Sequence, residues 1–278
     1  MDAGLNVVPL AAAEHEHIFG GKAVSLGAAL RAGLPVPPGV AVPAPLVDHI
    51  ADAKPDAVAA LLESAHVPDA RLAVRSSAVG EDSGDASFAG QHATKLNVRR
   101  PGLQAAVRMV WESARTKSAL AYRSRKGLPP EPRIAVVVQM LVEPLAAGVL
   151  FTRNPVTGAD ERMIEAAWGL GEAVVNGAVI PDRFRLDARG RLVESSPGEK
   201  DVKVWYGEDD GTIDVPVPAD LRSVPCLRTE QVEALNALAD RCIGVWGPAL
   251  DIEWALAGDG RLYLLQCRPI TTLQQQFS

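Results

Sequence analysis

The alternation of apolar and polar residues is clearest in DIEWALAGDGRLYLLQCRPI, residues 251–270. Successive side chains of a strand point to opposite faces, and a central Gly-Asp-Gly is typical of a tight turn, so this stretch predicts a β-hairpin. Asp251 and Glu253 are two residues apart and therefore share one face of the first strand. Gln266 and Arg268 share a face of the second strand in the same way.

The loop length of this hairpin decides whether the four polar side chains meet. With an even loop we expect Asp251 opposite Gln266 and Glu253 opposite Leu264, so that all four converge on one face. A three-residue loop would place Asp251 opposite Cys267 and turn the amide and the guanidinium away, unless a bulge restored the phase. Converged, the set suits a magnesium polyphosphate, because Mg²⁺ takes oxygen ligands and arginine grips phosphate oxygens. A solvated charged face is the alternative.

The remaining patterns mix helix and strand periods, which predicts an α+β protein. Helical spacing occupies residues 23–32, 101–113, 114–126 and the segment after Thr229. Continuous or alternating apolar runs predict strands at 133–142, 148–152 and 162–166. The stiff GLPPEP break at 127–132 is a candidate boundary, and we expect an N-terminal lobe, 1–140, and a C-terminal lobe, 141–278. The acidic GEDDG at 207–211 is expected to be a solvated loop.

Two segments of the first lobe could hold an anion. Lys22 follows a double glycine where a helix opens, so its ammonium and the helix N-terminus could face phosphate; a surface lysine is the alternative. A predicted strand ends in Arg75, and a loop rich in Gly, Ser, Asp and Glu follows, residues 76–91. Its backbone N–H groups and hydroxyls could wrap phosphates, with Arg75 as a fixed cation, although such runs are often plain loops. The candidates in the loop are Ser76, Ser77 and Gly90.

Two further places are candidates for nucleotide contacts. The end of the apolar strand, with Gln139, Met140 and Val142, could offer a backbone N–H and C=O to an adenine edge. Arg123 could reach a phosphate, or it could simply complement the C-terminal end of its helix.

Composition excludes some classes of protein. The net charge of −6 argues against nucleic-acid binding. The cysteines, Cys226, Cys242 and Cys267, are three in number and widely spaced, which fits a reducing cytosol without a disulfide framework. No signal-peptide pattern and no apolar run of membrane length occurs, so we predict a cytoplasmic protein with no membrane partner.

Five sequence motifs occur in the following order between about residues 19 and 271: GGKAVSLG, RSSAVGEDSGDASFAGQ, GVLFTRNPVTG, EAAWGLGEAVVNGAVIPD and DIEWAL…LYLLQCRPI. In this order they resemble the ATP-binding domain of phosphoenolpyruvate synthases, pyruvate phosphate dikinases and rifampin phosphotransferases. The resemblance implies an ATP-grasp fold, in which ATP is held between two lobes of mixed or antiparallel sheet with helices.

The resemblance also implies roles. The cations that hold the ATP phosphates would be Lys22, Arg75 and Arg268, with Arg123 as a further one. The Mg²⁺–ATP ligands would be Asp251, Glu253 and Gln266. Residues 76–91 would be the phosphate-covering loop, and residues 139–142 the adenine hinge.

The departure from the family concerns the acceptor. In the dikinases a histidine on a swivelling domain, in a Thr-Gly-Gly-x-x-Ser/Cys-His setting, receives the phosphate. The histidines of this chain all lack that setting: His15, His17, His49, His66 and His92. The resemblance therefore implies transfer to a separate domain or protein, leaving AMP and phosphate. A kinase or ligase acting directly on a small molecule would leave ADP. A regulatory module without turnover is the third hypothesis, against which the complete set of phosphate and metal residues argues.

Overall fold

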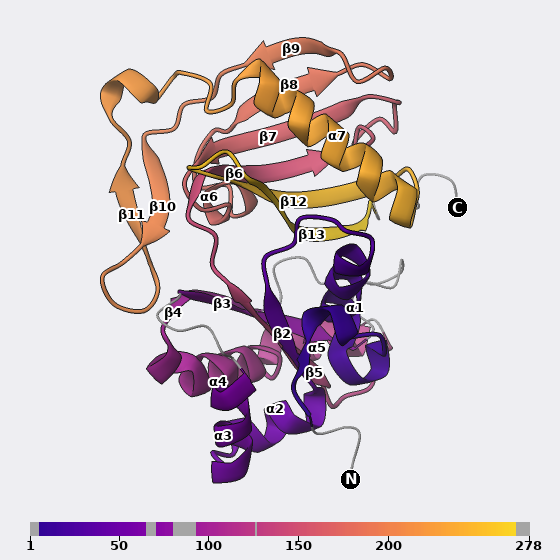
Figure 1. The fold of residues 1–278 in the computed structure, drawn as a ribbon, viewed down its shortest axis with the longest axis vertical. Helices are drawn as coiled ribbons and strands as arrows, with labels where there is room; N and C mark the ends of the chain where they lie inside the picture. The colour runs from indigo at the N-terminus through magenta and orange to yellow at the C-terminus, as the bar shows by residue number, and fades with distance from the viewer. Residues whose placement is uncertain (1–5, 65–70, 80–92, 126, 271–278) are drawn as a thin grey trace. The chain divides into compact units, whose positions relative to one another are not determined.

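The chain divides into two compact units. A computed structural model describes residues 6–64, 71–79, 93–125 and 127–270 (Figure 1). Unit 1 comprises residues 1–31, 37–141 and 206–211, and unit 2 comprises 32–36, 142–205 and 212–278. The main boundary between the two units therefore falls after Leu141, next to the expected boundary after residue 140. Two short segments belong to the unit formed mainly by the other half of the chain: 32–36 to unit 2 and 206–211 to unit 1. These assignments were not expected, because they depend on contacts between segments far apart in the sequence.

Unit 1 is built on a five-stranded sheet in the order β1-β2-β5-β3-β4, with antiparallel neighbours throughout. The strands are β1 (Val8–Pro9), β2 (Gly39–Val42), β3 (Leu72–Ala78), β4 (Thr94–Val98) and β5 (Ile134–Met140). The helices are η1 (Leu10–Ala12), α1 (Glu16–Arg31), α2 (Ala44–Ala51), α3 (Pro55–Ser64), η2 (Arg100–Gly102), α4 (Leu103–Ser113) and α5 (Lys117–Arg125). Residues 134–138 of β5 are at most 2% exposed, which confirms the strand predicted from the apolar run. The core lies between this sheet and α2, α3 and α4.

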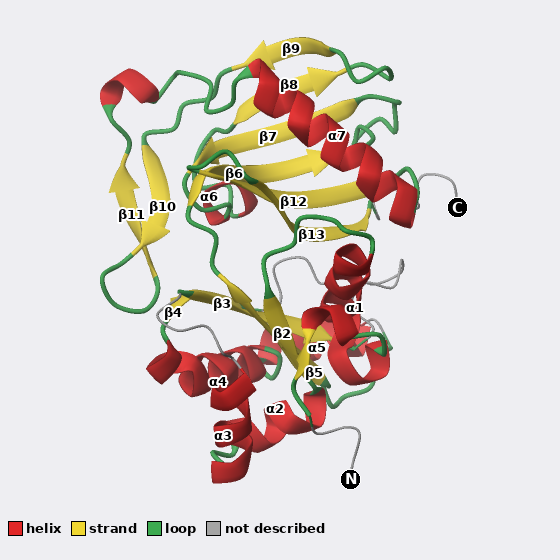
Figure 2. Ribbon diagram, in the orientation of Figure 1, coloured by secondary structure: helices red, strands yellow, loops and turns green. Residues whose placement is uncertain are grey.

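Unit 2 contains a six-stranded antiparallel sheet in the order β13-β12-β6-β7-β8-β9 and a separate hairpin, β10-β11 (Figure 2). The strands are β6 (Pro144–Phe151), β7 (Arg162–Trp168), β8 (Asp182–Leu186), β9 (Leu192–Ser196), β10 (Val202–Tyr206), β11 (Thr212–Pro216), β12 (Leu250–Ala257) and β13 (Leu262–Pro269). The helices are α6 (Glu172–Val175), η3 (Ala219–Leu221) and α7 (Thr229–Trp246). The mixture of helices and antiparallel sheets confirms the α+β class. No helix within the described ranges is long and apolar enough to cross a membrane.

Helix α7 covers one face of the unit 2 sheet (Figure 1). Its buried stripe is Val232, Leu235, Leu238, Ala239 and Cys242. Helical spacing predicts a core-facing stripe at 232, 235, 238, 242 and 245, and the last position is wrong, because Val245 is 39% exposed. Burying this stripe against the sheet removes apolar surface from water and accounts for the position of the helix.

The acidic hairpin tip is docked rather than free. Its side chains at 208–210 are exposed, as expected of a solvated loop. Its backbone carbonyls, however, accept hydrogen bonds from the Asn97 amide: Nδ2 lies 2.6 Å from the Asp209 oxygen, 2.7 Å from that of Gly211 and 3.2 Å from that of Gly207. The Arg71 guanidinium lies 4.1 Å from the centre of the Tyr206 ring. These contacts make residues 206–211 part of unit 1, and the prediction of a solvated loop is wrong for the backbone.

Unit 2 also encloses an ion pair that the sequence did not indicate. The side chains of Asp182 and Lys200 are paired and fully buried. Oδ1 of Asp182 also accepts the Gly198 N–H at 2.8 Å, and Oδ2 accepts the Cys226 N–H at 2.7 Å. Such a network is stabilising only while every member keeps its partners.

Candidate functional site

The β12-β13 hairpin has a three-residue loop, residues 258–260, closed by the bond from Ala257 N–H to the Arg261 carbonyl at 2.8 Å. Gly260 takes φ 85°, the left-handed conformation that such a loop requires at its last position. The strands pair Trp254 with Leu264 and then shift register by one residue. The expected even loop is therefore wrong.

The register shift returns Gln266 and Arg268 to the face of Asp251 and Glu253, from which the three-residue loop alone would have turned them away. It is a bulge at Leu265, after which Glu253 pairs with Gln266 and Asp251 with Arg268. The predicted pairings, Asp251 with Gln266 and Glu253 with Leu264, are wrong by two residues. Directly paired residues of antiparallel strands share a face, so all four polar side chains still lie together.

Asp251 divides its two carboxylate oxygens between two environments. Oδ2 accepts from Arg268 Nε at 2.9 Å and from Nη2 at 2.8 Å. Oδ1 is buried and accepts no hydrogen bond from any residue that the structure describes. Burial raises the pKa of this carboxyl, Arg268 lowers it in part, and Glu253 raises it further. A buried, partnerless carboxylate oxygen is costly unless a cation satisfies it.

This arrangement fits Mg²⁺. Within the described residues no group of three or more His, Cys, Asp or Glu side chains could hold a metal. A cation at Asp251 and Glu253 would therefore take further ligands from water and a phosphate group, which is how Mg²⁺ is commonly bound with nucleotides.

The same sheet face continues from the carboxylates into an apolar cluster. It consists of Val142, Ala147 and Ala255, with the partly buried Ala257, Tyr263 and Leu265 packed against them. Ala255 is two residues from Glu253, so the acidic and apolar parts share one side of β12. An apolar surface beside groups that could bind phosphate suits an adenine ring. Apart from Val142, the sequence does not indicate this cluster, because its members are ordinary strand residues.

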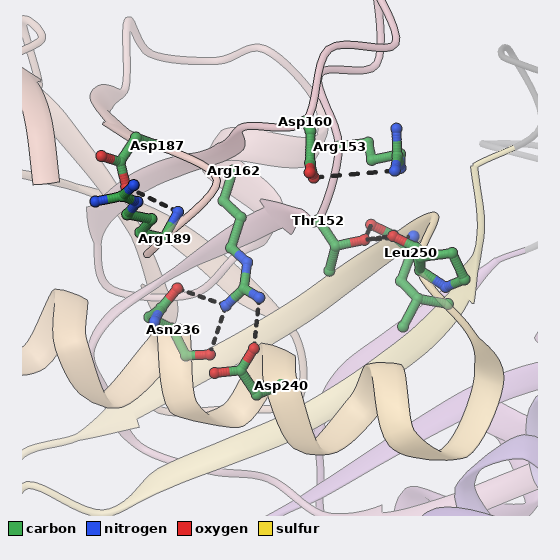
Figure 3. Close-up of polar contacts among 10 residues, drawn as sticks. Thr152, Arg153, Asp160, Arg162, Asp187, Arg189, Asn236, Asp240 and Leu250 are labelled. Carbon is green, nitrogen blue, oxygen red and sulfur yellow. Dashed lines mark hydrogen bonds and ion pairs between the residues drawn. The ribbon is translucent and has the colours of Figure 1, made fainter. Parts of the chain in front are cut away.

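The strand β12 is anchored immediately before Asp251. Thr152, which follows β6, donates from Oγ1 to the Pro248 carbonyl at 2.6 Å and accepts the Leu250 N–H at 2.7 Å (Figure 3). Its own N–H bonds to the Leu250 carbonyl at 2.9 Å. Thr152 thus fixes the end of the strand that presents the carboxylates.

In unit 1, Lys22 lies just after a kink in α1. Gly20 has φ 75° and ψ 167°, and a Cβ added there would lie 2.0 Å from the Ser77 carbonyl oxygen. The Ser77 hydroxyl donates to the Phe19 carbonyl at 2.7 Å and accepts the Ala23 N–H at 3.0 Å. Lys22 is only 7% exposed, so the surface-lysine alternative does not hold. Ser77, predicted as a nucleotide ligand, instead holds the turn that carries Lys22.

Strand alternation separates the other phosphate candidates. Arg75 is 9% exposed and shares a face of β3 with Ser77, the face against which α1 packs. Ser76 is 2% exposed and lies on the opposite face, with Val74 and the hydrophobic core. Its side chain is therefore turned away from Lys22 and Arg75, against the prediction. Gly90 and nearly all of the 76–91 loop lie outside the described residues.

The predicted adenine hinge is largely occupied by bonds within unit 1. The Met140 N–H bonds to the Pro38 carbonyl at 2.9 Å, and the Leu141 N–H to the Arg71 carbonyl at 2.8 Å. The Gln139 side chain donates to the Pro37 carbonyl at 3.0 Å. In this arrangement the N–H of Met140 cannot also serve adenine, which leaves Val142 as the candidate in this segment.

Arg123 is engaged beside its own helix. Its Nε donates to the Pro129 carbonyl at 3.0 Å, and Nη2 lies 3.5 Å from the Glu131 carbonyl oxygen. Burial lowers the pKa of this guanidinium. These contacts favour the structural alternative over a phosphate contact.

Comparison with known proteins gives consistent relatives. The chain is 37% identical to a probable phosphoenolpyruvate synthase of Methanothermobacter thermautotrophicus, over 92% of this chain and 44% of that protein. It is 41% identical to a rifampicin phosphotransferase of Streptomyces sviceus, over 72% and 23% respectively. The prodigiosin synthesizing transferase PigC of Serratia marcescens is 39% identical over 92% and 32%. This chain thus spans less than half the length of these relatives.

A solved structure, the VanG D-Ala:D-Ser ligase of Enterococcus faecalis, aligns with a TM-score of 0.44 at 12% identity, over 90% of this chain and 52% of that one. A likeness at this score supports no conclusion. The family model described as "Pyruvate phosphate dikinase, AMP/ATP-binding domain" matches residues 46–278. The chain belongs to that family.

Proposed function

We propose that the protein is the ATP–Mg²⁺-binding part of a dikinase-type phosphotransferase with an ATP-grasp fold. The observation that carries the proposal is Asp251, a carboxylate with one oxygen held by Arg268 and the other buried with no partner among the described residues. Membership of an AMP/ATP-binding domain family supports the nucleotide.

The polar face of the hairpin would hold the metal and the phosphates. Asp251, Glu253 and Gln266 would hold Mg²⁺, which, when bound, offsets negative charge on the phosphate oxygens. Arg268 would grip phosphate oxygens while Asp251 keeps its guanidinium in place. Lys22 and Arg75 would supply the remaining phosphate cations. Phosphoryl transfer depends mainly on positioning and charge stabilisation, which such a set provides.

The apolar cluster would receive adenine. Val142, Ala147 and Ala255 are themselves buried, so the partly buried Ala257, Tyr263 and Leu265 packed against them would offer the apolar surface next to the carboxylates. Adenine would then be bound chiefly by burial of its ring.

The acceptor would be a histidine on a separate swivelling domain or partner protein, with AMP and phosphate as the products. The greater length of the relatives supports the existence of further domains. Direct transfer to a small molecule is the second candidate, favoured by the relative named rifampicin phosphotransferase.

The decisive experiment identifies the nucleotide product. The protein is incubated with ATP and Mg²⁺, with and without a candidate phosphohistidine domain from a relative, and the nucleotides are separated. AMP supports the dikinase reaction, ADP the direct kinase, and binding without turnover a regulatory module. Glu253→Gln should abolish product formation. Glu165→Gln is the matched control, because Glu165 lies in the same cross-strand row, pairs with Arg183 and is outside the proposed site.

A further inference from the structure

An apolar strip lies beside the proposed metal site on the unit 2 sheet. Asp251 of β12 pairs with Phe151 of β6, and Phe151 pairs with Met163 of β7. Directly paired residues share a face, so these three side chains form one row across the sheet. Val149 of β6 pairs with Glu253 and adds an apolar side chain in the next row. The apolar strip is thus Val149, Phe151 and Met163, each partly exposed.

The apolar strip lies on the sheet face opposite α7. Arg162 of β7 reaches α7, where it donates to the Asn236 carbonyl at 2.9 Å (Figure 3). Successive strand residues point to opposite faces, so Met163 points away from the helix. The row on the α7 side is at most 2% exposed and consists of Leu150, Ile164, Phe184 and Ile252. The apolar strip is therefore separate from the core between sheet and helix.

Phe151 is held close to Asp251. The residue after Phe151, Thr152, bonds through its N–H to the Leu250 carbonyl at 2.9 Å, which fixes this end of β6 against β12. Neighbouring strands lie about 4.8 Å apart, so the backbones of Phe151 and Asp251 are separated by about 5 Å. Arg268 of the edge strand β13 pairs with Asp251 from its other side. Across the sheet, a second substrate would therefore approach Asp251 from the side of Phe151.

The charged residues beyond the apolar strip are paired with one another. Arg183 contacts Glu165 at 3.1 Å. Arg185, which pairs with Met163 across the strands, contacts Glu161 at 3.2 Å and Glu194 at 3.0 Å. Both arginines are thus already matched by carboxylates. This arrangement disfavours an acceptor that carries a carboxylate of its own.

We propose that Phe151 and Met163 determine the specificity for the phosphoryl acceptor, and that they favour the neutral imidazole of a histidine. The inference rests on the proposed function and names the residues that would receive its acceptor. The imidazole is a flat ring without charge, and it would pack on the Phe151 ring and the Met163 side chain beside Asp251. Aromatic rings stabilise one another in such contacts, and the methionine thioether also packs well against rings.

The chemistry of the acceptor agrees with an apolar strip. A neutral imidazole attacks phosphorus through the nitrogen that carries no proton. Its lone pair forms the N–P bond, the P–O bond to the departing nucleotide breaks, and the nucleotide oxygen keeps those electrons. No base is needed at the attacking atom. A hydroxyl acceptor would have to lose a proton, yet Asp251 and Glu253 are assigned to the metal and Glu165 is paired with Arg183.

The test compares wild type with Phe151→Ala, Met163→Ala and Phe151→Leu. The last variant keeps an apolar side chain and decides the matter if Phe151→Ala does not fold. Calorimetry measures ATP–Mg²⁺ affinity, and kinetics measures phosphorylation of the phosphohistidine domain of a relative. We expect the KM for that domain to rise about tenfold or more, because truncating a buried contact residue weakens association, while ATP affinity is kept. The control is Val193→Ala in β9, whose apolar side chain is 48% exposed.

A second measurement needs no turnover. The probe is 4-methylimidazole, the histidine side chain as a free molecule, at about pH 9, where imidazole is neutral. Saturation-transfer NMR should show contact with the wild-type protein and its loss in Phe151→Ala, with little contact for acetate. Equal signals for 4-methylimidazole in both proteins would overturn the proposed contact.

The outcomes separate this inference from the proposed function. Variants that phosphorylate the domain with the wild-type KM would overturn the role of Phe151 and Met163, while the proposed function would stand. Wild-type protein that binds ATP but forms ADP by direct transfer to a hydroxyl would overturn the preference for imidazole. Wild-type protein that neither binds nor turns over ATP would refute the proposed function, and this inference with it.

Discussion

At the scale of residues, the proposed site depends on the hydrogen bonds of one carboxylate group and one hydroxyl group. Asp251 accepts hydrogen bonds from Arg268 with one oxygen, and its other oxygen is buried with no hydrogen bond from any residue in the described part of the chain. Ser77 uses its hydroxyl twice, on the Phe19 carbonyl and the Ala23 N–H. The first arrangement leaves one oxygen for the proposed cation, whereas the Ser77 hydroxyl already uses both its donor and an acceptor position within unit 1. The two residues should therefore respond differently to substitution.

Asp251→Asn keeps the shape but removes the charge that would hold Mg²⁺. Hydrogen bonds to charged groups contribute about 1.5–3 kcal/mol, so we expect Mg²⁺-dependent ATP affinity to fall about 10- to 100-fold while adenosine affinity is largely kept. Calorimetry with ATP in excess Mg²⁺ and in chelator measures this. Asp259→Asn in the exposed loop, where the carboxylate accepts from the Arg261 N–H at 3.0 Å and from Arg261 Nε at 2.7 Å, is the control. Wild-type metal dependence in Asp251→Asn would contradict the assignment.

Ser77→Ala removes both hydroxyl bonds from the turn that carries Lys22. The orphaned buried groups should cost about 1–3 kcal/mol of unfolding free energy. ATP affinity should also fall more than adenosine affinity, because the position of Lys22 relaxes. Urea unfolding and calorimetry measure the two effects. Ser76→Ala, on the other face of β3, should leave the ratio of ATP to adenosine affinity unchanged; an equal change in both variants would show that Ser77 does not position Lys22.

At the scale of elements, local patterns predicted β5, α7 and both strands of the hairpin, because burial imposes a period on each. They did not predict the pairing of Asp251 with Arg268. A bulge at Leu265 decides that register, and Leu265 looks like any other strand residue. Nor did they predict the docked tip at 206–211, whose partner Asn97 is more than a hundred residues earlier in the sequence. The shared polar face was predictable because strand parity alone determines it.

Asn97 tests the docking of the hairpin tip. It is buried, takes φ 57°, and supplies an amide to the tip carbonyls. Asn97→Asp would direct a carboxylate at those carbonyls, and we expect unfolding free energy to fall by about 1–3 kcal/mol or more. Asn97→Gly relieves the backbone while removing the amide, so a similar loss there assigns the effect to the side chain. Asp209→Asn, with an exposed side chain, should change stability little; unchanged stability in Asn97→Asp would show that the docking bonds contribute nothing.

At the scale of the whole molecule, each unit has its own sheet and its own buried residues, so damage to one need not spread evenly. The ion pair of Asp182 and Lys200 belongs to unit 2 alone. Removing one partner leaves an uncompensated buried charge, whereas removing both can be nearly neutral.

Lys200→Met should therefore destabilise unit 2 by about 3–5 kcal/mol, and the double variant with Asp182→Asn should recover part of that loss. Hydrogen exchange followed by mass spectrometry measures the effect by segment. We expect amides of β7 and β8 to lose protection while those of β3 and β5 keep theirs. Equal loss in both units would instead indicate that they unfold as one.

The short segments that each unit takes from the other half of the chain have a consequence for recombination of the gene. Unit 1 includes residues 206–211 from within the second half of the chain, and unit 2 includes 32–36 from within the first. A crossover after codon 141 would separate each unit from a segment that packs with it. We therefore expect recombination to transfer the two units together far more readily than it transfers either unit alone. Shuffling experiments with relatives should recover folded chimaeras when both exchanged segments travel with their units.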